Sequence, residues 1–257
     1  MTAVLRVMLI AVAMLCVPVV GYAAAPEPLR VEAGDGAVEL SRYAADVAGP
    51  RPAVLVLHGS RGIELRRRAY QRYAERLAEE GIDVYLVSYF TAVDRESFAA
   101  NASARDRREA YETAGFDGWA KRVTSVVTAI LSRPDCSGSI GLLGFSLGGY
   151  VAAETAAHDS RVSALAVMYG GMPDAALAGV AHLPPLLEIH GDADRNVPFA
   201  KGQELVALAK RLGAAAELVS YPGRAHGFDF SDTDPMASDA TARVVRFFRI
   251  RLDANRR

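Results

Sequence analysis

Apolar residues gather in short continuous runs, separated by longer segments in which apolar and polar positions alternate at helical spacing. The clearest run is 52–58 (Pro-Ala-Val-Leu-Val-Leu-His), and a run of this kind is typical of a strand buried on both faces. Residues 66–80 instead place Tyr70, Tyr73 and Leu77 three and four positions apart, as on one face of a helix. The pattern predicts a buried strand followed by an amphipathic helix.

The same alternation continues to the end of the chain. Further strands are predicted at 82–88, 139–145, 162–169, 185–190 and 217–221, helices at 119–132, 147–157, 199–212 and 236–252, and a hairpin at 29–33 and 36–43. Strands that alternate with helices imply right-handed crossovers and a parallel sheet. We therefore expect one α/β domain over residues 26–257, with a mainly parallel central sheet flanked by helices and an N-terminal antiparallel hairpin.

Residues 90–111 interrupt this alternation. The segment is polar, charged and poor in large apolar residues, so it is predicted to be an excursion or lid rather than core. Its arginines would either meet an acidic substrate or form a solvated face, and the solvated face is favoured. They are Arg95, Arg105, Arg107 and Arg108.

Residues 1–25 have the layout of a secretory signal peptide. Arg6 precedes an apolar run at 7–20, small residues follow, and cleavage is expected near Ala23 or Ala24. The alternative is an uncleaved anchor, but the run has 14 residues, short of the roughly 20 that span a bilayer. We expect export to the periplasm or the medium, without stable membrane insertion after cleavage.

Composition narrows the possible partners. With 51% apolar residues and a net charge of −1, the chain has a globular balance and no field that would attract nucleic acid. Its two cysteines, Cys16 and Cys136, form no CxxC or Cys/His cluster, which disfavours a disulfide scaffold or a structural zinc site. Signal cleavage would leave Cys136 alone. We expect no nucleic-acid partner and no metal.

The sharpest chemical signal lies between the strand at 139–145 and the helix at 147–157. Residues 144–148 match G-x-S-x-G with Ser146 at its centre, and Gly149 adds another glycine. This pattern is typical of a nucleophile elbow, a strained turn that lifts the serine hydroxyl clear of the sheet and leaves no room for side chains beside it. The turn would place the amide of Leu147 at a helix start, where it can donate to an oxyanion. A glycine-rich turn with a capping serine is the alternative.

A serine hydroxyl needs a base that takes its proton. His226 follows the last predicted strand in a loop that can reach the elbow from the carboxyl edge of the sheet, so we take it as the base. His190 ends a strand, where packing or a local hydrogen bond is the expected role. Of the other histidines, His58 is expected to shape a loop, His158 to be exposed after a helix, and His182 to lie in a loop.

A carboxylate must orient the base, and the loop after the strand at 185–190 offers two. Asp192 lies near the strand end, where turn stabilisation is expected, whereas Asp194 lies farther into the loop and is favoured. The order Ser146, Asp194, His226 is the order of α/β-hydrolases. The loop at 58–62 would supply the second oxyanion donor, the amide of Ser60 or alternatively of Arg61, unless it is a plain glycine turn.

These segments resemble the dienelactone hydrolase family of the α/β-hydrolase superfamily. The resemblance is carried by 144–149 (Gly-Phe-Ser-Leu-Gly-Gly), 191–198 (Gly-Asp-Ala-Asp-Arg-Asn-Val-Pro) and 221–228, which contains His-Gly-Phe, and it covers most of residues 50–250. It implies an α/β-hydrolase fold and hydrolysis of an ester or lactone through an acyl-enzyme, with no metal or organic cofactor.

Two departures from the best-known members of that family bear on the substrate. Their nucleophile is a cysteine, whereas Ser146 stands here, and they carry an arginine shortly after the histidine to hold a substrate carboxylate. Here Gly-Phe-Asp-Phe follows at 227–230. A neutral ester therefore fits better than dienelactone.

The predicted function is that of a serine hydrolase acting on a small-molecule carboxylic ester or lactone. The same three side chains would also serve a peptidase or an acyltransferase. A prolyl-oligopeptidase type of peptidase usually carries a large extra domain, for which this chain has no room. A secreted binding protein that kept the fold and lost activity is the alternative from another class.

Overall fold

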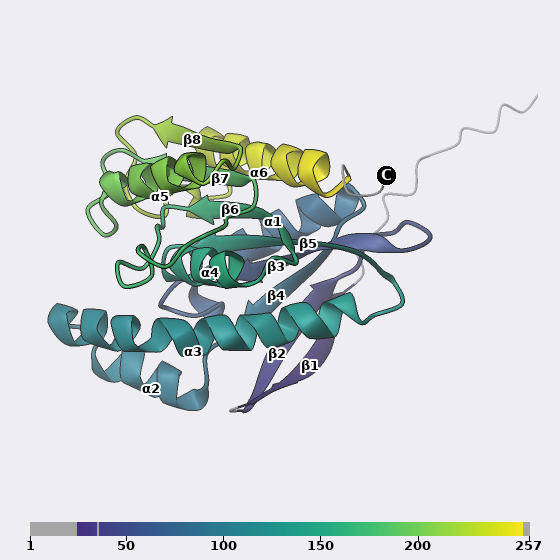
Figure 1. Cartoon of the computed structure of the whole chain (residues 1–257), viewed down its shortest axis with the longest axis horizontal. Helices are drawn as coiled ribbons and strands as arrows, with labels where there is room; N and C mark the ends of the chain where they lie inside the picture. Colours follow the sequence, from purple (N-terminus) through teal and green to yellow (C-terminus); the bar gives the residue numbers. More distant parts are fainter. Residues whose placement is uncertain (1–24, 35, 254–257) are drawn as a thin grey trace, which may run out of the picture.

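The computed structural model describes residues 25–34 and 36–253 (Figure 1). The predicted signal segment up to residue 24, its cleavage site and Cys16 lie outside the described residues. Across the described ranges, eight strands form one sheet. They are β1 (Glu27–Ala33), β2 (Gly36–Tyr43), β3 (Arg51–Leu57), β4 (Asp83–Ser88), β5 (Cys136–Phe145), β6 (Val162–Met168), β7 (Leu186–Gly191) and β8 (Ala216–Tyr221).

The strands lie in the order β1-β2-β4-β3-β5-β6-β7-β8. Every pair from β4 through β3 to β8 is parallel, whereas β1 and β2 form an antiparallel hairpin whose β2 pairs antiparallel with β4. This confirms the predicted sheet, mainly parallel with an antiparallel hairpin at its N-terminal edge. Because the parallel strands share one direction, their carboxyl ends all lie at the same edge.

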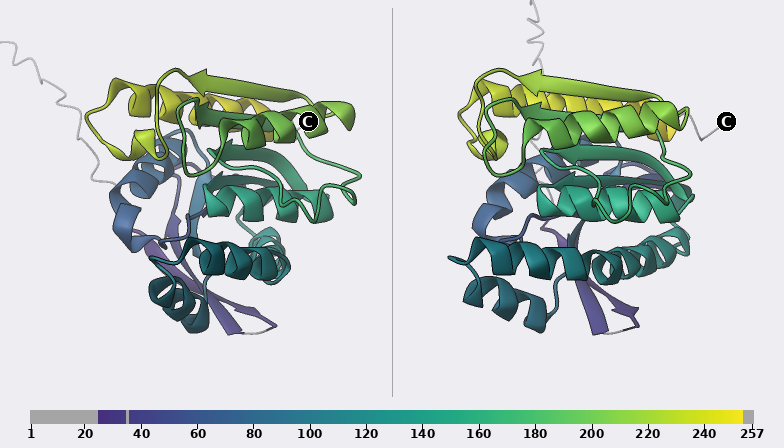
Figure 2. Two further views of the ribbon diagram at one scale, coloured as in Figure 1. Left: turned by 90° about the vertical axis from the view of Figure 1, so that its left-hand side faces the viewer. Right: turned by 60° about the vertical axis from the view of Figure 1, so that its left-hand side comes forward.

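Helices cover both faces of the sheet. Helices α3, α4 and α5 pack on one face and α1 and α6 on the other, while α2 lies beside α3 (Figures 1 and 2). Within the described part of the chain, no helix combines the length and the apolar character needed to cross a membrane. The bounds are α1 (Arg67–Glu79), α2 (Ala92–Ala100), α3 (Arg105–Leu131), α4 (Leu147–His158), α5 (Phe199–Arg211) and α6 (Pro235–Asp253), with 3₁₀ turns at Glu64–Arg66 and Phe228–Phe230.

The two covered faces explain the continuous apolar runs. Successive side chains of a strand point to opposite faces. In β3, Leu55 and Leu57 pack in the core under α3 and α4, whereas Val54 and Val56 pack in the core with α1 and α6, and all four are buried. Neither face tolerates a polar residue, so the strand contains none at these positions.

The segment 90–111 differs from its prediction. It forms α2 and the first turns of α3, and α2 begins with a capping box in which Thr91 and Asp94 exchange hydrogen bonds. Phe90 and Phe98 are buried and stack on each other beside Trp119. The expectation of an excursion outside the core was wrong at Phe90 and Phe98, which turn inward, whereas Val93 of the same segment stays exposed.

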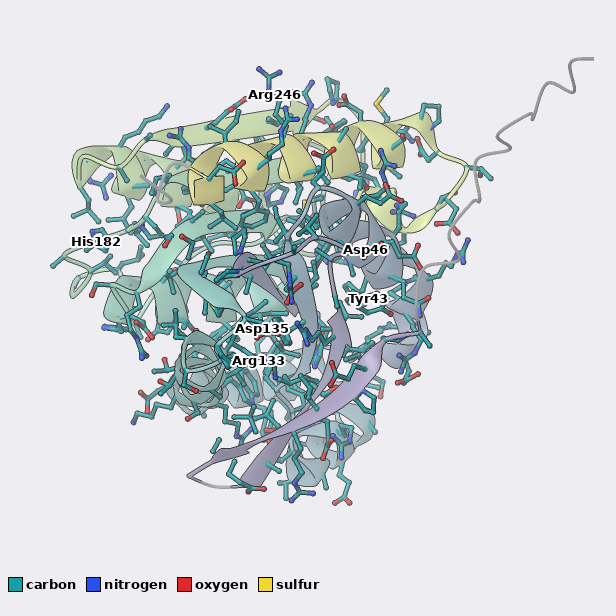
Figure 3. All side chains as sticks on the ribbon, turned by 90° about the vertical axis from the view of Figure 1, so that its right-hand side faces the viewer. Tyr43, Asp46, Arg133, Asp135, His182 and Arg246 are labelled. Carbon is teal, nitrogen blue, oxygen red and sulfur yellow. The ribbon has the colours of Figure 1, made fainter. Side chains whose placement is uncertain are left out.

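The amino ends of the parallel strands are joined by a buried ion network. The carboxylate of Asp83, at the start of β4, accepts hydrogen bonds from Arg42 (2.6 Å) and Arg51 (2.8 Å). Asp135, just before β5, also accepts from Arg42 (2.6 Å) and pairs with Arg133 beside it (Figure 3). This network ties four strands together at the end of the sheet opposite the candidate site.

Candidate active site

Ser146 lies in a strained turn between β5 and α4. Its backbone has φ 54° and ψ −121°, a region that residues with a side chain rarely adopt. Its N–H donates to the carbonyl of Met168 at the end of β6 (2.9 Å), which holds the turn against the neighbouring strand. This is the backbone geometry that the G-x-S-x-G pattern predicts.

The glycines around Ser146 are required by close backbone contacts. A Cβ added at Gly144 would lie 2.2 Å from the carbonyl oxygen of Gly148, and one at Gly148 would lie 2.3 Å from the carbonyl oxygen of Leu57. A Cβ at Gly149 would lie 2.8 Å from a methyl of Val167. Any side chain at these positions would push α4 away from the sheet, so the sharp turn depends on their absence.

Three loops at the carboxyl edge bring Ser146, His226 and Asp194 together. His226 Nε2 lies 3.0 Å from Ser146 Oγ, and His226 Nδ1 lies 2.7 Å from Asp194 Oδ2. Ser146 follows β5, Asp194 follows β7 and His226 follows β8. The three residues singled out from the sequence therefore form one continuous chain of hydrogen bonds.

The environment of Asp194 keeps its carboxylate ionised. Burial would raise its pKa, but hydrogen bonds from His190 and His226 outweigh burial and hold the pKa well below the usual range. The backbone N–H groups of Asn196 and Val197 donate to its other oxygen, at 2.8 and 3.0 Å. An ionised Asp194 accepts a hydrogen bond from the N–H at His226 Nδ1, which leaves Nε2 free to accept from the Ser146 hydroxyl.

The alternative carboxylate, Asp192, has a different position. It is exposed, and its Oδ1 accepts from the N–H of Gly223 (2.6 Å) in the turn after β8. This contact links two loops and does not involve His226. The geometry thus separates the two candidates in the way that their positions in the sequence suggested.

The other histidines have other partners or lie at the surface. His58 is buried, stacks on Tyr89 and contacts the carbonyl of Gly59 through Nδ1 (2.8 Å), and burial lowers its pKa to about 4. His158 is exposed at the end of α4, and His182 projects from the periphery (Figure 3). No group of three or more His, Cys, Asp or Glu residues within 25–34 and 36–253 is arranged to hold a metal ion.

Two backbone segments next to Ser146 carry the candidate oxyanion donors. Leu147 is the first residue of α4, so its N–H has no acceptor within the helix. The loop after β3 passes close by, because a Cβ added at Gly59 would lie 3.5 Å from Ser146 Cβ. Ser60 and Arg61 of this loop line the same cleft as Ser146.

The cleft above Ser146 has a volume of about 1430 Å³. Its walls include the first half of α3, the loop around Pro173–Gly179 and the 3₁₀ turn Phe228–Phe230. Of the four arginines in the segment 90–111, only Arg105 and Arg108 line the cleft, and they pair with Glu109 and Glu112. Arg105 is therefore already partnered by a carboxylate of its own helix. The Arg108–Glu112 contact is looser, at 3.8 Å, and burial raises the pKa of Glu112 to about 7.

The sequence analysis missed a second set of residues around His226. Tyr169 also has a positive φ (44°), and its ring packs edge-to-face against the His226 ring with centroids 4.7 Å apart. Its hydroxyl and that of Tyr73 donate to the buried carboxylate of Asp229, at 2.9 and 2.8 Å. Asp229 stands between two phenylalanines, and an acid in such an apolar setting is a signal that a buried partner exists.

A family model, the dienelactone hydrolase family, matches residues 40–251. The chain belongs to the dienelactone hydrolase family. Membership identifies it as a hydrolase, and it confirms the family resemblance inferred from the motifs. A search among curated proteins gave no match.

Solved structures confirm the α/β-hydrolase fold of this family member. A dienelactone hydrolase from Anabaena variabilis has 21% sequence identity and a TM-score of 0.71, over 89% of this chain and 100% of the other. A thermostable carboxylesterase cloned from a metagenomic library has 18% sequence identity and a TM-score of 0.71, over 90% of this chain and 90% of the other. An esterase from Pyrobaculum calidifontis has 20% sequence identity and a TM-score of 0.68, over 88% of this chain and 85% of the other.

The close contact at the elbow predicts that Gly144→Ala is destabilising. Its methyl would overlap the Gly148 carbonyl, and overpacking of this kind lowers the free energy of unfolding by about 3 kcal/mol. The matched control is Gly118→Ala in α3, where a Cβ meets nothing within 4 Å and alanine favours the helix. Urea denaturation measures both, and equal stability of the two variants would contradict the role assigned to the contact.

Proposed function

We propose that this protein hydrolyses a carboxylic ester or lactone through an acyl-enzyme formed on Ser146. The observation that carries the proposal is the chain of hydrogen bonds from Asp194 through His226 to the Ser146 hydroxyl, at the floor of an open cleft. Family membership supports the hydrolytic reaction, and the likeness in fold to carboxylesterases supports an ester as the substrate.

In the first step His226 Nε2 takes the proton of Ser146 while Oγ attacks the carbonyl carbon. The C=O electrons move to the carbonyl oxygen, and the resulting oxyanion accepts from the amide of Leu147 and from that of Ser60, with Arg61 as the alternative to Ser60. Each such donor contributes about 3–4 kcal/mol to lowering the barrier. Asp194 holds the imidazole in the required tautomer and stabilises its cation.

Collapse of the tetrahedral intermediate breaks the bond to the alcohol oxygen, which receives the proton from His226. Water then enters, gives a proton to His226 and attacks the acyl carbon. The second intermediate expels Ser146 Oγ, which regains its proton from His226. The acid leaves, and the enzyme returns to its starting state without any cofactor.

Residues near His226 favour a neutral substrate. Phe228 and Phe230 line the cleft in the segment after His226 where the best-known family members carry an arginine, and Arg105 pairs with Glu109. A panel of p-nitrophenyl esters from acetate to palmitate defines the preferred acyl length. Higher kcat/KM for an ester with a carboxylate in its acyl group than for its uncharged counterpart would contradict this preference.

Replacing the nucleophile is expected to abolish turnover. Ser146→Ala should lower kcat about a million-fold on the best ester of the panel, since no other group can form the acyl-enzyme. A fluorophosphonate probe should label the wild type and not the variant. Ser60→Ala is the matched control, because it keeps the backbone amide and should retain both labelling and most of the activity.

Loss of labelling in Ser60→Ala with normal labelling in Ser146→Ala would reverse the assignment. A folded wild type that the probe does not label would favour a non-catalytic binding protein. Added alcohol or peptide substrates separate the remaining alternatives, since an acyltransferase forms a new ester and a peptidase releases an amine.

The two aspartates of the loop after β7 provide a second test. Asp194→Asn removes the negative charge that orients and stabilises His226, so kcat should fall about ten-thousand-fold. Asp192→Asn keeps a hydrogen-bond acceptor for Gly223 and should change kcat less than about threefold. Steady-state kinetics measures both, and similar losses in the two variants would reject Asp194 as the third member.

We further propose that the protein is exported, on the basis of Arg6, the apolar run at 7–20 and the small residues that follow. N-terminal sequencing of protein recovered from the periplasm or the medium of a bacterial host should show a chain that begins just after Ala23 or Ala24. Full-length protein retained in the membrane fraction would indicate an anchor instead.

A further inference from the structure

A second histidine lies behind the candidate triad and contacts the same carboxylate oxygen as His226. His190, near the end of β7, has no exposed surface. Its Nδ1 lies 2.9 Å from Glu188 Oε1, and its Nε2 lies 3.1 Å from the carbonyl of Val197 and 3.4 Å from Asp194 Oδ2. Asp194 Oδ2 therefore lies between two imidazoles.

The contacts of His190 indicate that its ring is a cation. Both ring nitrogens face oxygen acceptors, and a neutral imidazole has only one N–H to donate. Glu188 Oε1 also accepts from the N–H of Gly170 (3.3 Å). Burial raises the pKa of Glu188, and the hydrogen bond to His190 opposes that rise. Burial alone would lower the pKa of His190, but hydrogen bonding to Asp194 and Glu188 outweighs burial and raises it to about 9.

The pair of Glu188 and His190 is sealed from solvent. A Cβ added at Gly202 of α5 would lie 2.8 Å from His190 Nδ1 and 2.9 Å from Glu188 Oε1, so the helix backbone packs directly on the pair. Glu188 Oε2 has no hydrogen-bond partner among the described residues. A buried ion pair with an unsatisfied oxygen is a poor source of stability compared with apolar packing, which suggests that it serves the neighbouring site.

We propose that His190 is a positioning residue for the hydrolase proposed above. Held as a cation by Glu188, it fixes the Asp194 carboxylate and weakens the attraction of that carboxylate for a proton on His226. The inference rests on the proposed function, because it assigns His226 as the base. A base of this kind must be unprotonated to act. The cation at His190 would therefore extend activity toward lower pH.

The groups that face the rings of His190 and His226 come from several elements. From α5, His190 meets Phe199 and Gly202, which carry no charge. Tyr150 of α4 interacts electrostatically with Glu188. On its other side His226 faces Ser146 and Tyr169, whose hydroxyl is bonded to Asp229. The charged groups in contact with His190 are Glu188 and Asp194, so replacing His190 removes the positive charge that lies between two carboxylates.

The test is the pH profile of kcat/KM for His190→Gln. Loss of the cation should move the acidic limb upward by about one pH unit, since Asp194 then attracts the proton on His226 more strongly. His182→Gln, which removes an exposed histidine, is the matched control and should leave the limb in place. A lower activity at every pH with no shift of the limb would overturn the proposal, because a purely structural role predicts that result.

A double variant guards against a folding defect. His190→Gln alone leaves Glu188 buried without its partner and should lower Tm, whereas Glu188→Gln with His190→Gln removes both charges and should recover much of that loss. The double variant should keep the shifted limb, because the cation next to Asp194 is still absent. A limb that returns to its wild-type position in the double variant would also overturn the proposal.

NMR separates this inference from the proposed function. In ¹⁵N spectra of the histidine side chains, recorded in a Ser146→Ala background that needs no turnover, the His190 ring should stay protonated at pH 7.5. Adding His190→Gln should move the titration of the His226 ring to higher pH. An unlabelled, inactive wild type would defeat the proposed function alone, whereas a neutral His190 ring or an unmoved His226 titration would defeat the inference.

Discussion

The contact between the end of β5 and the first turn of α4 is the constraint on which the site depends. At Gly144 the end of β5 approaches α4, and at Gly148 the same turn of α4 approaches the end of β3, so closely that a single added carbon would overlap a carbonyl oxygen. This closeness forces Ser146 into a positive φ and lifts its hydroxyl above the edge of the sheet. It also starts α4 at Leu147, so one turn sets the position of the proposed nucleophile and of a candidate oxyanion donor.

The proposed base, His226, is held from two sides by buried groups that the local sequence does not connect. On one side Asp194 contacts His226 and is itself contacted by His190, which Glu188 holds. On the other side the ring of Tyr169 packs against His226. Fixed side chains of this kind keep a catalytic arrangement in place without reorganisation during the reaction.

Much of the fold followed from the periodicity of apolar residues, but the structure of the segment 90–111 did not. The parallel strands were predicted because each is buried on both faces and contains an unbroken apolar run. The segment 90–111 was assigned wrongly because its polar residues outnumber its apolar ones. Phe90 and Phe98 bury enough aromatic surface beside Trp119 to bring the segment into the core, which a count of apolar residues underrates.

The sequence by itself determined the parallel strands, the helices outside the segment 90–111, and which three side chains follow β5, β7 and β8. The reason is that right-handed crossovers place the carboxyl ends of parallel strands at one edge, so residues just after them converge. Only the tertiary structure decided the partners of the buried charges, such as Asp229, which is 156 positions from Tyr73, and the placing of His190 against Asp194. Such contacts depend on how whole elements pack, and no local pattern of residues encodes that packing.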